Sequence, residues 1–383
     1  MKEKLLRAVS YVLVAALASV MTLVLVDREV GLRPGKLEQL ESLIQEKFIG
    51  EAEETALRDA AAEAMVAATG DRWSYYIPAS EYASYVETQK NAYVGIGVTI
   101  QLTEDESGFL IIDVAQGGPA WEAGLEVLDV ITAVEGEAVA GMTTAQVRDR
   151  VKGKEGTFVK LTVLREDEER EVSVERRTVE TPVATYTMLE GNIGLVTIVN
   201  FDSRCARESI DAIEALLEQG AEKLIFDVRD NPGGFASELV DLLDYLLPEG
   251  PLFRTVNYKG VENVDESDGE FLDVPMAVLV NGDSYSAAEF FAVALREYEA
   301  AVVVGEQTVG KGYFQTTYNL EDGSAVALSI GEYFTPQGKN LAGVGITPDV
   351  VVEVDEETAA AIYYGTLDPE EDPQIRAAVE ALE

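Results

Sequence analysis

The sequence predicts an α/β fold for most of the chain. Between residues 192 and 306, short apolar strands alternate with amphipathic helices, a pattern typical of a largely parallel sheet covered by helices. The composition, with 47% apolar and 26% charged residues, is that of a globular protein. With 383 residues, the chain is also long enough for two or three domains with separate cores.

The α/β region is assigned to residues 179–360, and its elements follow a regular order. Residues 249–274 are predicted to form an acidic, glycine-containing loop, and residues 361–383 an acidic loop followed by a terminal helix. The expected strands are 192–201, 223–229, 275–281 and 300–306, and the expected helices are 203–220, 236–248 and 286–299.

Two smaller regions precede the α/β region. Residues 28–90 carry apolar side chains at helical spacing, which predicts helices, and Gly70 is expected to end one of them. From Tyr93 the apolar residues alternate with period two, which predicts short strands. With one or two short helices, these strands predict a small, partly open barrel over residues 91–178. Pro182 interrupts the pattern and marks the boundary that follows.

Residues 1–27 predict a membrane anchor. Three basic residues precede residues 8–26, an uncharged and mostly apolar stretch that nearly spans a hydrocarbon core as a helix. Because a basic flank stays in the cytoplasm, the chain after residue 27 is expected on the extracytoplasmic side of the membrane. The alternative is a cleavable signal peptide, since Ala16-Leu17-Ala18 fits a processing site.

The charge balance and two residue counts limit the chemistry. The 29 basic and 70 acidic residues give a formal net charge of -41, so nucleic acid is not an expected partner. The chain has no histidine, which removes Ser-His-Asp catalysis and the commonest zinc ligand. Cys205 is the single cysteine, which excludes an intramolecular disulfide, and we expect it to be a packing residue.

The stretch YVGIGV is a candidate carboxylate-binding loop. Gly95 and Gly97 flank Ile96, so successive backbone N–H groups can turn toward one point and hold a carboxylate. The alternative interpretation is a strand start softened by glycine. Together with GGPAWEAGLEVLDVITAVEG, the stretch resembles a PDZ domain of the bacterial protease type.

That resemblance implies a peptide-binding role for named residues. Gly95, Ile96, Gly97 and Val98 match the loop that holds a peptide's terminal carboxylate, and a neighbouring apolar groove would take the last side chains. Lys152 stands where such proteases often carry arginine. It is therefore either a second reader of the carboxylate or a solvated lysine.

Two strand-to-helix turns could carry catalysis. In FDVRDNPGGFASELV, Gly233 and Gly234 let a backbone N–H face a ligand, as an oxyanion hole requires, although glycine turns are common in α/β folds. In VNGDSYSAAEF, Ser286 stands beside the free N–H groups that begin a helix, and it is a candidate nucleophile. Ser284 is expected to cap that helix.

A lysine further along the chain could replace the missing histidine. Lys311 lies between two glycines in VGKGYFQ, and a lysine acts as a general base when burial lowers its pKa toward neutrality. Gln315 follows four residues later. An even spacing on a strand would place both side chains on one face, where Gln315 could accept a hydrogen bond from Lys311.

Taken in order, NPGG, SYSAAE and GKGYFQ strongly resemble the C-terminal processing peptidases of family S41. The resemblance covers essentially everything outside the anchor and implies a crotonase/ClpP-like α/β core with an inserted PDZ domain. It implies that Ser286 is the nucleophile, Lys311 the general base and Gln315 the residue that positions the lysine. No metal or cofactor is then required.

The same resemblance implies an oxyanion hole made by the amide of Ala287 and that of Gly233 or Gly234. One departure is Tyr285, followed by Ala288, where many relatives read SASAS. The departure removes small residues beside the nucleophile, so the family pattern does not predict the shape of the substrate pocket.

The expected function is a serine endopeptidase anchored in the cell membrane of a bacterial envelope. It would cut extracytoplasmic proteins near free apolar C-termini, which the PDZ domain would recognise, with the peptide gating the site. The helical ends of the chain form dimer contacts in relatives, so a homodimer is expected. One alternative is a catalytically silent PDZ adaptor. The presence of Ser286, Lys311 and Gln315 argues against it. The other is a hydratase or acyl-transfer enzyme on a crotonase-like sheet, which needs neither anchor nor groove.

Overall fold

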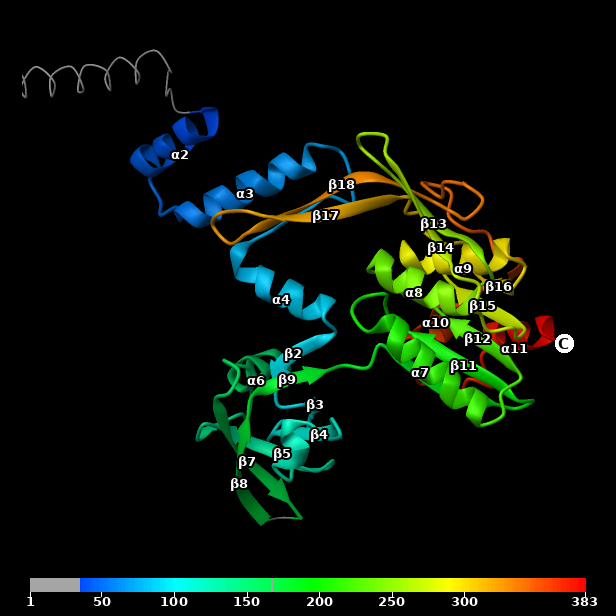
Figure 1. Ribbon diagram of the computed structural model, residues 1–383. Helices are drawn as coiled ribbons and strands as arrows, with labels where there is room; N and C mark the ends of the chain where they lie inside the picture. Colours follow the sequence, from blue (N-terminus) through cyan, green and yellow to red (C-terminus); the bar gives the residue numbers. More distant parts are fainter. Residues whose placement is uncertain (1–34, 167) are drawn as a thin grey trace, which may run out of the picture. The chain divides into compact units, whose positions relative to one another are not determined.

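The computed structural model describes residues 35–166 and 168–383 (Figure 1). The predicted anchor, residues 1–27, lies outside this range. Among the described residues, no helix is both long and apolar enough to cross a membrane. The chain divides into two compact units, Met1–Tyr76 and Ile77–Glu383.

The described part of the first unit contains the two helices that the sequence predicts. Helix α2, Lys36–Lys47, and helix α3, Glu54–Ala67, are joined by ion pairing between Arg58 and Glu41. Gly70 has φ 75° just after α3, as expected of a residue that ends a helix. Large apolar side chains of both helices are exposed: Leu37, Leu40 and Leu43 on α2, and Met65 on α3.

In the second unit, the small barrel follows the end of strand β1 (Tyr75–Ile77) and helix α4 (Ala79–Gln89). Its main sheet has the order β3-β4-β5-β7-β8, with β6 beside β5, while β2 and β9 form a separate two-stranded ladder. The elements are β2 Ala92–Gly95, β3 Val98–Leu102, β4 Phe109–Val114, α5 Pro119–Glu122, β5 Val130–Val134, β6 Glu137–Ala138, α6 Thr144–Val151, β7 Phe158–Arg165, β8 Glu168–Glu175 and β9 Arg177–Glu180. The barrel has a core of its own, which includes Phe109, Ile111, Ile131 and Leu161.

The central sheet of the α/β region has the order β10-β11-β12-β15-β16-β19. Every neighbouring pair is parallel except β10 with β11, which confirms the predicted parallel sheet. The strands are β10 Ala184–Leu189, β11 Ile193–Ile198, β12 Lys223–Asp227, β15 Met276–Val280, β16 Ala301–Gly305 and β19 Val350–Val351.

Helices cover both faces of this sheet (Figure 1). On one face, α7 (Cys205–Glu218), α8 (Ala236–Leu246) and α9 (Ala287–Glu297) pack in the larger core, where Cys205 is buried as expected. On the other face, Ile375 and Ala378 of α11 (Pro373–Ala381) pack against Ile225 and Leu279. Helix α10, Glu356–Tyr363, precedes α11. Since both faces are covered, the central strands β15 and β16 carry no polar side chain.

A second sheet corrects one prediction. Residues 249–274 do not form a simple loop, because β13 (Gly250–Asn257) and β14 (Glu262–Ser267) pair as an antiparallel hairpin. Strand β13 also pairs with β18 (Ala325–Phe334), which pairs with β17 (Tyr313–Asn319). Strand β14, ENVDES, lacks apolar alternation, so its strand structure depends on pairing with β13.

Candidate active site

Ser286 lies at the turn between β15 and α9. Strand β15 is buried at every position, and Ser286 is the N-cap residue of α9. Its backbone has φ 60° and ψ -125°, which is rare for a residue with a side chain. Strain of this kind is retained where the surroundings enforce it, typically at functional sites. Only 3% of Ser286 is exposed, so the hydroxyl is held in a buried, fixed setting.

Ser284 does not cap α9, contrary to the prediction. Its hydroxyl donates to the carbonyl of Val228 at 2.7 Å and accepts the N–H of Asn281 at 3.0 Å. Both bonds are made by Ser284 Oγ, and neither goes to an N–H group of α9. Ser284 instead connects the nucleophile turn to Val228, which follows β12.

The glycine turn, residues 231–234, packs directly against the nucleophile turn. A Cβ on Gly233 would lie 2.7 Å from the Cβ of Ser286, and one on Gly234 would lie 2.2 Å from the carbonyl carbon of Phe201. Both glycines also have positive φ, 86° and 156°. Only glycine meets the steric and the dihedral requirement at these two positions.

Three backbone amides in the two turns are candidates for the predicted oxyanion hole: those of Gly233, Gly234 and Ala287. The N–H of Gly233 donates to Asn231 Oδ1 at 2.8 Å, so it is engaged within the glycine turn. Within the described ranges, the N–H groups of Gly234 and Ala287 donate to no other group of the chain. Of the two glycines predicted for an oxyanion hole, the geometry therefore favours Gly234 as the partner of Ala287.

Glu289 joins the nucleophile turn to the lysine loop. Its Oε2 accepts the N–H groups of Ser286 at 3.0 Å and Lys311 at 2.9 Å, and its Oε1 accepts the N–H of Gly310 at 2.8 Å and the hydroxyl of Thr308 at 2.5 Å. Burial raises the pKa of the Glu289 carboxyl, and these four hydrogen bonds act in the opposite direction. The carboxylate is thus the fixed point that positions both candidate catalytic backbones.

Glu289 and Thr308 are not among the site residues predicted from the sequence. A signal for Glu289 was present, because it is the only charged side chain within the otherwise apolar first part of α9, AAEFFAVAL. A carboxylate on a buried helix needs partners, since an unpaired buried charge is very costly. The partners themselves come from a loop that only the fold brings near.

The side chain of Lys311 is partly buried and lies beside Tyr285. The Nζ atom is 5.9 Å from the centre of the Tyr285 ring, within the range of a cation–π contact. Burial, with Asp283 as a second cause, raises the pKa of the Tyr285 phenol, so this group stays neutral. The residue that departs from the family pattern therefore occupies space next to the candidate base.

Gln315 does not lie in the register that the sequence suggested. Lys311 precedes β17, and a bulge between Phe314 and Gln315 shifts the pairing with β18, so the expected even alternation is wrong. The amide nitrogen of Gln315 donates to the carbonyl of Tyr313 at 3.1 Å and the hydroxyl of Ser329 at 2.9 Å. These bonds fix the orientation of the amide and leave its oxygen as the acceptor.

The small barrel contains a groove of about 390 Å³ along the glycine-bearing loop. Apolar side chains from β3 and α6 line the groove, and the glycine-bearing loop and Lys152 also form part of its lining. Every residue predicted to bind a peptide is part of this lining: Gly95, Ile96, Gly97, Val98 and Lys152. The groove can thus accept apolar side chains next to a carboxylate.

Two family profiles match the sequence. Peptidase family S41 matches residues 192–352, and the PDZ domain matches residues 94–175. The first range contains both glycines of the turn, the candidate nucleophile and the candidate base, and the second contains the groove.

Curated relatives give matches over a longer range. A "Probable CtpA-like serine protease" of Staphylococcus aureus strain COL is 30% identical over 353 residues, which are 89% of this chain and 71% of the relative. Its counterpart in strain N315 is 32% identical over 322 residues, or 83% of this chain and 64% of the relative. The match thus leaves about a third of that second protein without a counterpart.

A solved structure shares the fold. The "Putative S41 protease" from Bacteroides fragilis NCTC 9343 has a TM-score of 0.53 and 16% sequence identity. The similarity covers 90% of this chain and 96% of that one. At this level of identity, the comparison supports the architecture alone.

Proposed function

Since the chain belongs to peptidase family S41, we propose that it is a serine endopeptidase in which Ser286 is the nucleophile and Lys311 the general base. The observation that carries this proposal is the shared hydrogen bonding of Glu289, whose Oε2 accepts the backbone N–H groups of both residues. In a chain without histidine, a lysine can take the proton as general base, and Glu289 links the Lys311 backbone to that of Ser286.

Acylation follows from these positions. Lys311 Nζ takes the hydroxyl proton of Ser286 as Oγ forms a bond to the peptide carbonyl carbon. The carbonyl oxygen becomes an oxyanion, and the N–H groups of Gly234 and Ala287 donate to it. When the C–N bond breaks, the Lys311 ammonium gives its proton to the departing amine. The acyl-enzyme ester and the new N-terminus are then complete.

Deacylation repeats the sequence with water. Lys311 takes a proton from a water molecule as its oxygen attacks the ester carbon, and the same two amides bind the oxyanion. The bond to Ser286 Oγ breaks, and the proton returns from Lys311 to that oxygen. Gln315 Oε1 accepts a hydrogen bond from the Lys311 ammonium and orients it, because the Gln315 amide nitrogen is already engaged with Tyr313 and Ser329.

The groove of the PDZ domain is proposed to select the substrate. A free C-terminal carboxylate would bind the N–H groups of the loop from Gly95 to Val98, assisted by Lys152, and apolar tail residues would fill the groove. The substrates are then proteins with free apolar C-termini, cut near those termini. Occupation of the groove would also favour the active arrangement of the site.

The location and assembly are further parts of the proposal. Residues 1–27 would anchor the chain in the cell membrane of a bacterial envelope, with the catalytic region on the extracytoplasmic side. The exposed apolar side chains of α2 and α3 would contact a second copy in a homodimer.

Cleavage of an unfolded protein with an apolar C-terminus tests the catalytic assignment. The full chain would be compared with Ser286→Ala and Lys311→Ala from pH 6 to 10, with Lys259→Ala as a matched control at an exposed lysine. Activity in wild type and the control alone, rising through one basic ionisation, would support the proposal. Cleavage by Lys311→Ala at the wild-type rate would refute the lysine's role.

The same experiment separates the adaptor alternative. If the substrate binds to all four proteins and none of them cuts it, the chain is a peptide-binding adaptor. A substrate that ends in two aspartates instead of apolar residues tests the specificity of the groove. The proposal predicts a higher KM for this substrate and therefore slower cleavage.

A further inference from the structure

The loop between β11 and α7, residues 199–204, forms hydrogen bonds with two other parts of the chain. One part is the pair of chain segments that enter and leave the small barrel. The other is the glycine turn. The two entering and leaving segments are Lys90–Asn91, just before β2, and Thr181, just after β9.

Arg204 binds both of these segments through their carbonyl groups. Its Nη1 donates to the carbonyl of Lys90 at 2.7 Å, and its Nη2 donates to those of Thr181 at 2.7 Å and Asn91 at 3.2 Å. Its Nε donates to Glu208 Oε1 at 2.7 Å, and the side chain is only 12% exposed. One guanidinium therefore fixes the spacing of both segments relative to α7.

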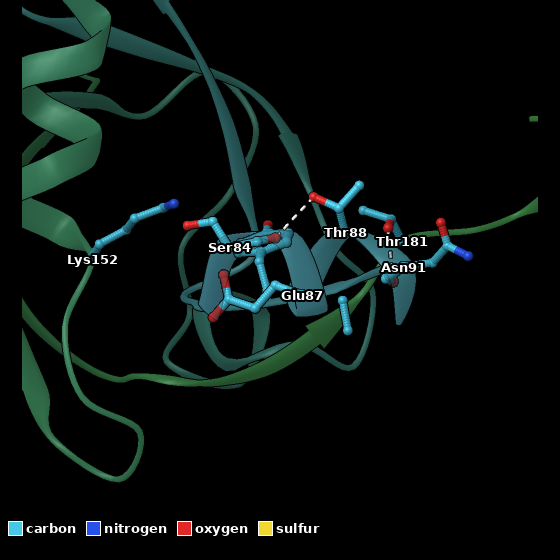
Figure 2. Close-up of a pocket in the computed structure, with 8 residues that line it drawn as sticks. Ser84, Glu87, Thr88, Asn91, Lys152 and Thr181 are labelled. Carbon is cyan, nitrogen blue, oxygen red and sulfur yellow. Dashed lines mark hydrogen bonds between the residues drawn. The ribbon is translucent and has the colours of Figure 1, made fainter. Parts of the chain in front are cut away.

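Asn91 provides a second connection to the same loop. Its amide nitrogen donates to Asn200 Oδ1 and to the carbonyl of Ser203, both at 3.1 Å, and its oxygen accepts from Asn200 Nδ2 at 2.7 Å. The backbone N–H and hydroxyl of Thr181 both donate to the Asn91 carbonyl at 2.8 Å. Asn91 and Thr181 lie together at one end of a pocket that Lys152 also lines (Figure 2).

The 199–204 loop also forms backbone hydrogen bonds with the glycine turn. The N–H of Phe201 donates to the carbonyl of Gly233 at 2.8 Å, and the N–H of Phe235 donates to the carbonyl of Phe201 at 2.7 Å. These two bonds enclose Gly234, the residue whose N–H is assigned to the oxyanion. A shift of Phe201 would therefore move the Gly234 amide directly.

The backbone of Arg204 is itself held to the helix that follows the glycine turn. Its N–H donates to Glu238 Oε1 at 3.2 Å, and the N–H of Ala206 donates to Glu238 Oε2 at 2.9 Å. Arg204 has φ 78°, in the left-handed region, which residues other than glycine adopt only at a cost in conformational free energy. The surrounding bonds thus maintain a strained conformation beside the candidate oxyanion hole.

We propose that Arg204 is a positioning residue for catalysis: by clamping both barrel-linking segments to the 199–204 loop, it holds Phe201, and through Phe201 it orients the Gly234 N–H toward the oxyanion. This proposal rests on the proposed peptidase function. Arg204 touches no reacting atom, so its loss should lower the turnover step while leaving binding in the PDZ groove unchanged.

The test compares Arg204→Gln and Arg204→Lys with Arg207→Gln. Arg207 is the matched control, because it lies on α7, its side chain is 65% exposed, and its ion pair with Glu208 is long, at 3.9 Å. Five quantities are measured on the full chain: kcat and KM on the unfolded substrate, the Kd of a peptide boronic acid that adds to Ser286, the Kd of a fluorescent apolar-ended peptide for the groove, and the urea midpoint.

We expect Arg204→Gln to lower kcat at least tenfold and to weaken boronate binding by a similar factor. Its KM and its affinity for the groove peptide should stay within about twofold of wild type. Arg204→Lys should recover part of kcat, since an ammonium can still donate to one or two of the three carbonyls. Arg207→Gln should match wild type in every measurement.

Two results would overturn the inference. One is an Arg204→Gln protein that folds and keeps wild-type kcat and boronate affinity. The other is a loss of kcat in Arg204→Gln that leaves boronate affinity intact, since the defect would then not lie at the oxyanion. If wild type itself neither cuts the substrate nor binds the boronate, it is the proposed peptidase function that fails, and this outcome is distinct from both.

Discussion

The hydroxyl of Thr308 donates to the carboxylate of Glu289 at 2.5 Å beneath the candidate active site. The same hydroxyl oxygen accepts the N–H of Ile346 at 2.7 Å, so Thr308 connects the carboxylate to a third segment of backbone. Glu289 in turn holds the backbones of Ser286 and Lys311. The relative position of nucleophile and base therefore depends on a threonine three residues before the lysine.

Replacing this hydroxyl should cost both stability and activity. Thr308→Val keeps the volume but removes a hydrogen bond to a charged group and leaves the Ile346 N–H without an acceptor. We expect a loss of about 2 kcal/mol in the free energy of unfolding and at least a tenfold lower kcat. Thr308→Ser keeps the hydroxyl and should stay close to wild type. Urea denaturation and steady-state kinetics would show this, and equal behaviour of the two variants would contradict it.

The glycine turn should tolerate no side chain at Gly234. A Cβ there would lie 2.2 Å from a backbone carbon of Phe201, so Gly234→Ala must displace the turn. We expect it to reduce kcat at least a hundredfold, a loss comparable with removal of one oxyanion donor. Gly282→Ala is the control in the nucleophile turn, because its Cβ would meet only the carbonyl of Gln307, at 3.9 Å. Similar kcat values for the two variants would contradict the role of the Gly234 amide.

The main elements of the α/β region could be predicted because their apolar pattern is local. The strand KLIFD and the helix that contains Cys205 are each recognisable from their own residues. Strand β14, by contrast, reads ENVDES and exists because β13 pairs with it, so no local pattern reveals it.

The candidate site was predictable in its residue types and less so in its geometry. Ser286 and Lys311 stand in recognisable contexts, and the structure places both beside Glu289. The engagement of the Gly233 amide with Asn231 and the bulge before Gln315 are tertiary details that spacing alone does not contain. For the same reason the capping role assigned to Ser284 was wrong.

The stability of the fold should depend on pH through Asp202. Burial, and secondly the nearby Glu238, raise the pKa of Asp202 to about 7, against about 3.9 in an unfolded chain. Between these two values the folded protein holds a proton that the unfolded chain has released, so the free energy of unfolding falls as pH rises through this window. Above about pH 7 the penalty is constant.

Asp202→Asn removes this titration and should therefore be more stable than wild type at pH 8. The difference should shrink as the pH falls toward 4. Urea midpoints measured from pH 4 to 8 would reveal the trend, with Asp211→Asn as the control at an exposed position on α7. A difference between Asp202→Asn and wild type that stays the same at every pH would show that Asp202 is not protonated in the folded state.

The C-terminal helix should depend on a buried ion pair. Arg229 Nη1 donates to Asp372 Oδ2 at 2.8 Å, the two side chains are only 4% and 3% exposed, and Asp372 is the N-cap residue of α11. Asp372→Ala leaves the guanidinium with only part of its countercharge, and we expect about 3–5 kcal/mol of destabilisation. Glu380→Gln, exposed on the same helix, should change stability by less than about 0.5 kcal/mol. A small effect of Asp372→Ala in urea denaturation would mean that α11 contributes little to the core.

Tyr285 should influence the pH dependence of catalysis. The centre of its ring lies 5.9 Å from Lys311 Nζ, and we expect the ring to stabilise the ammonium form by about 0.5–1 kcal/mol. Tyr285→Ala removes the ring, so the limb on which activity rises as the base loses its proton should move to lower pH by about half a unit. Tyr285→Phe keeps the ring face and should retain the wild-type profile, which separates the ring from the hydroxyl. The measurement is kcat/KM on the unfolded substrate from pH 6 to 10. A shift of equal size in both variants would assign the effect to the hydroxyl, and no shift in Tyr285→Ala would show that the ring does not affect the base.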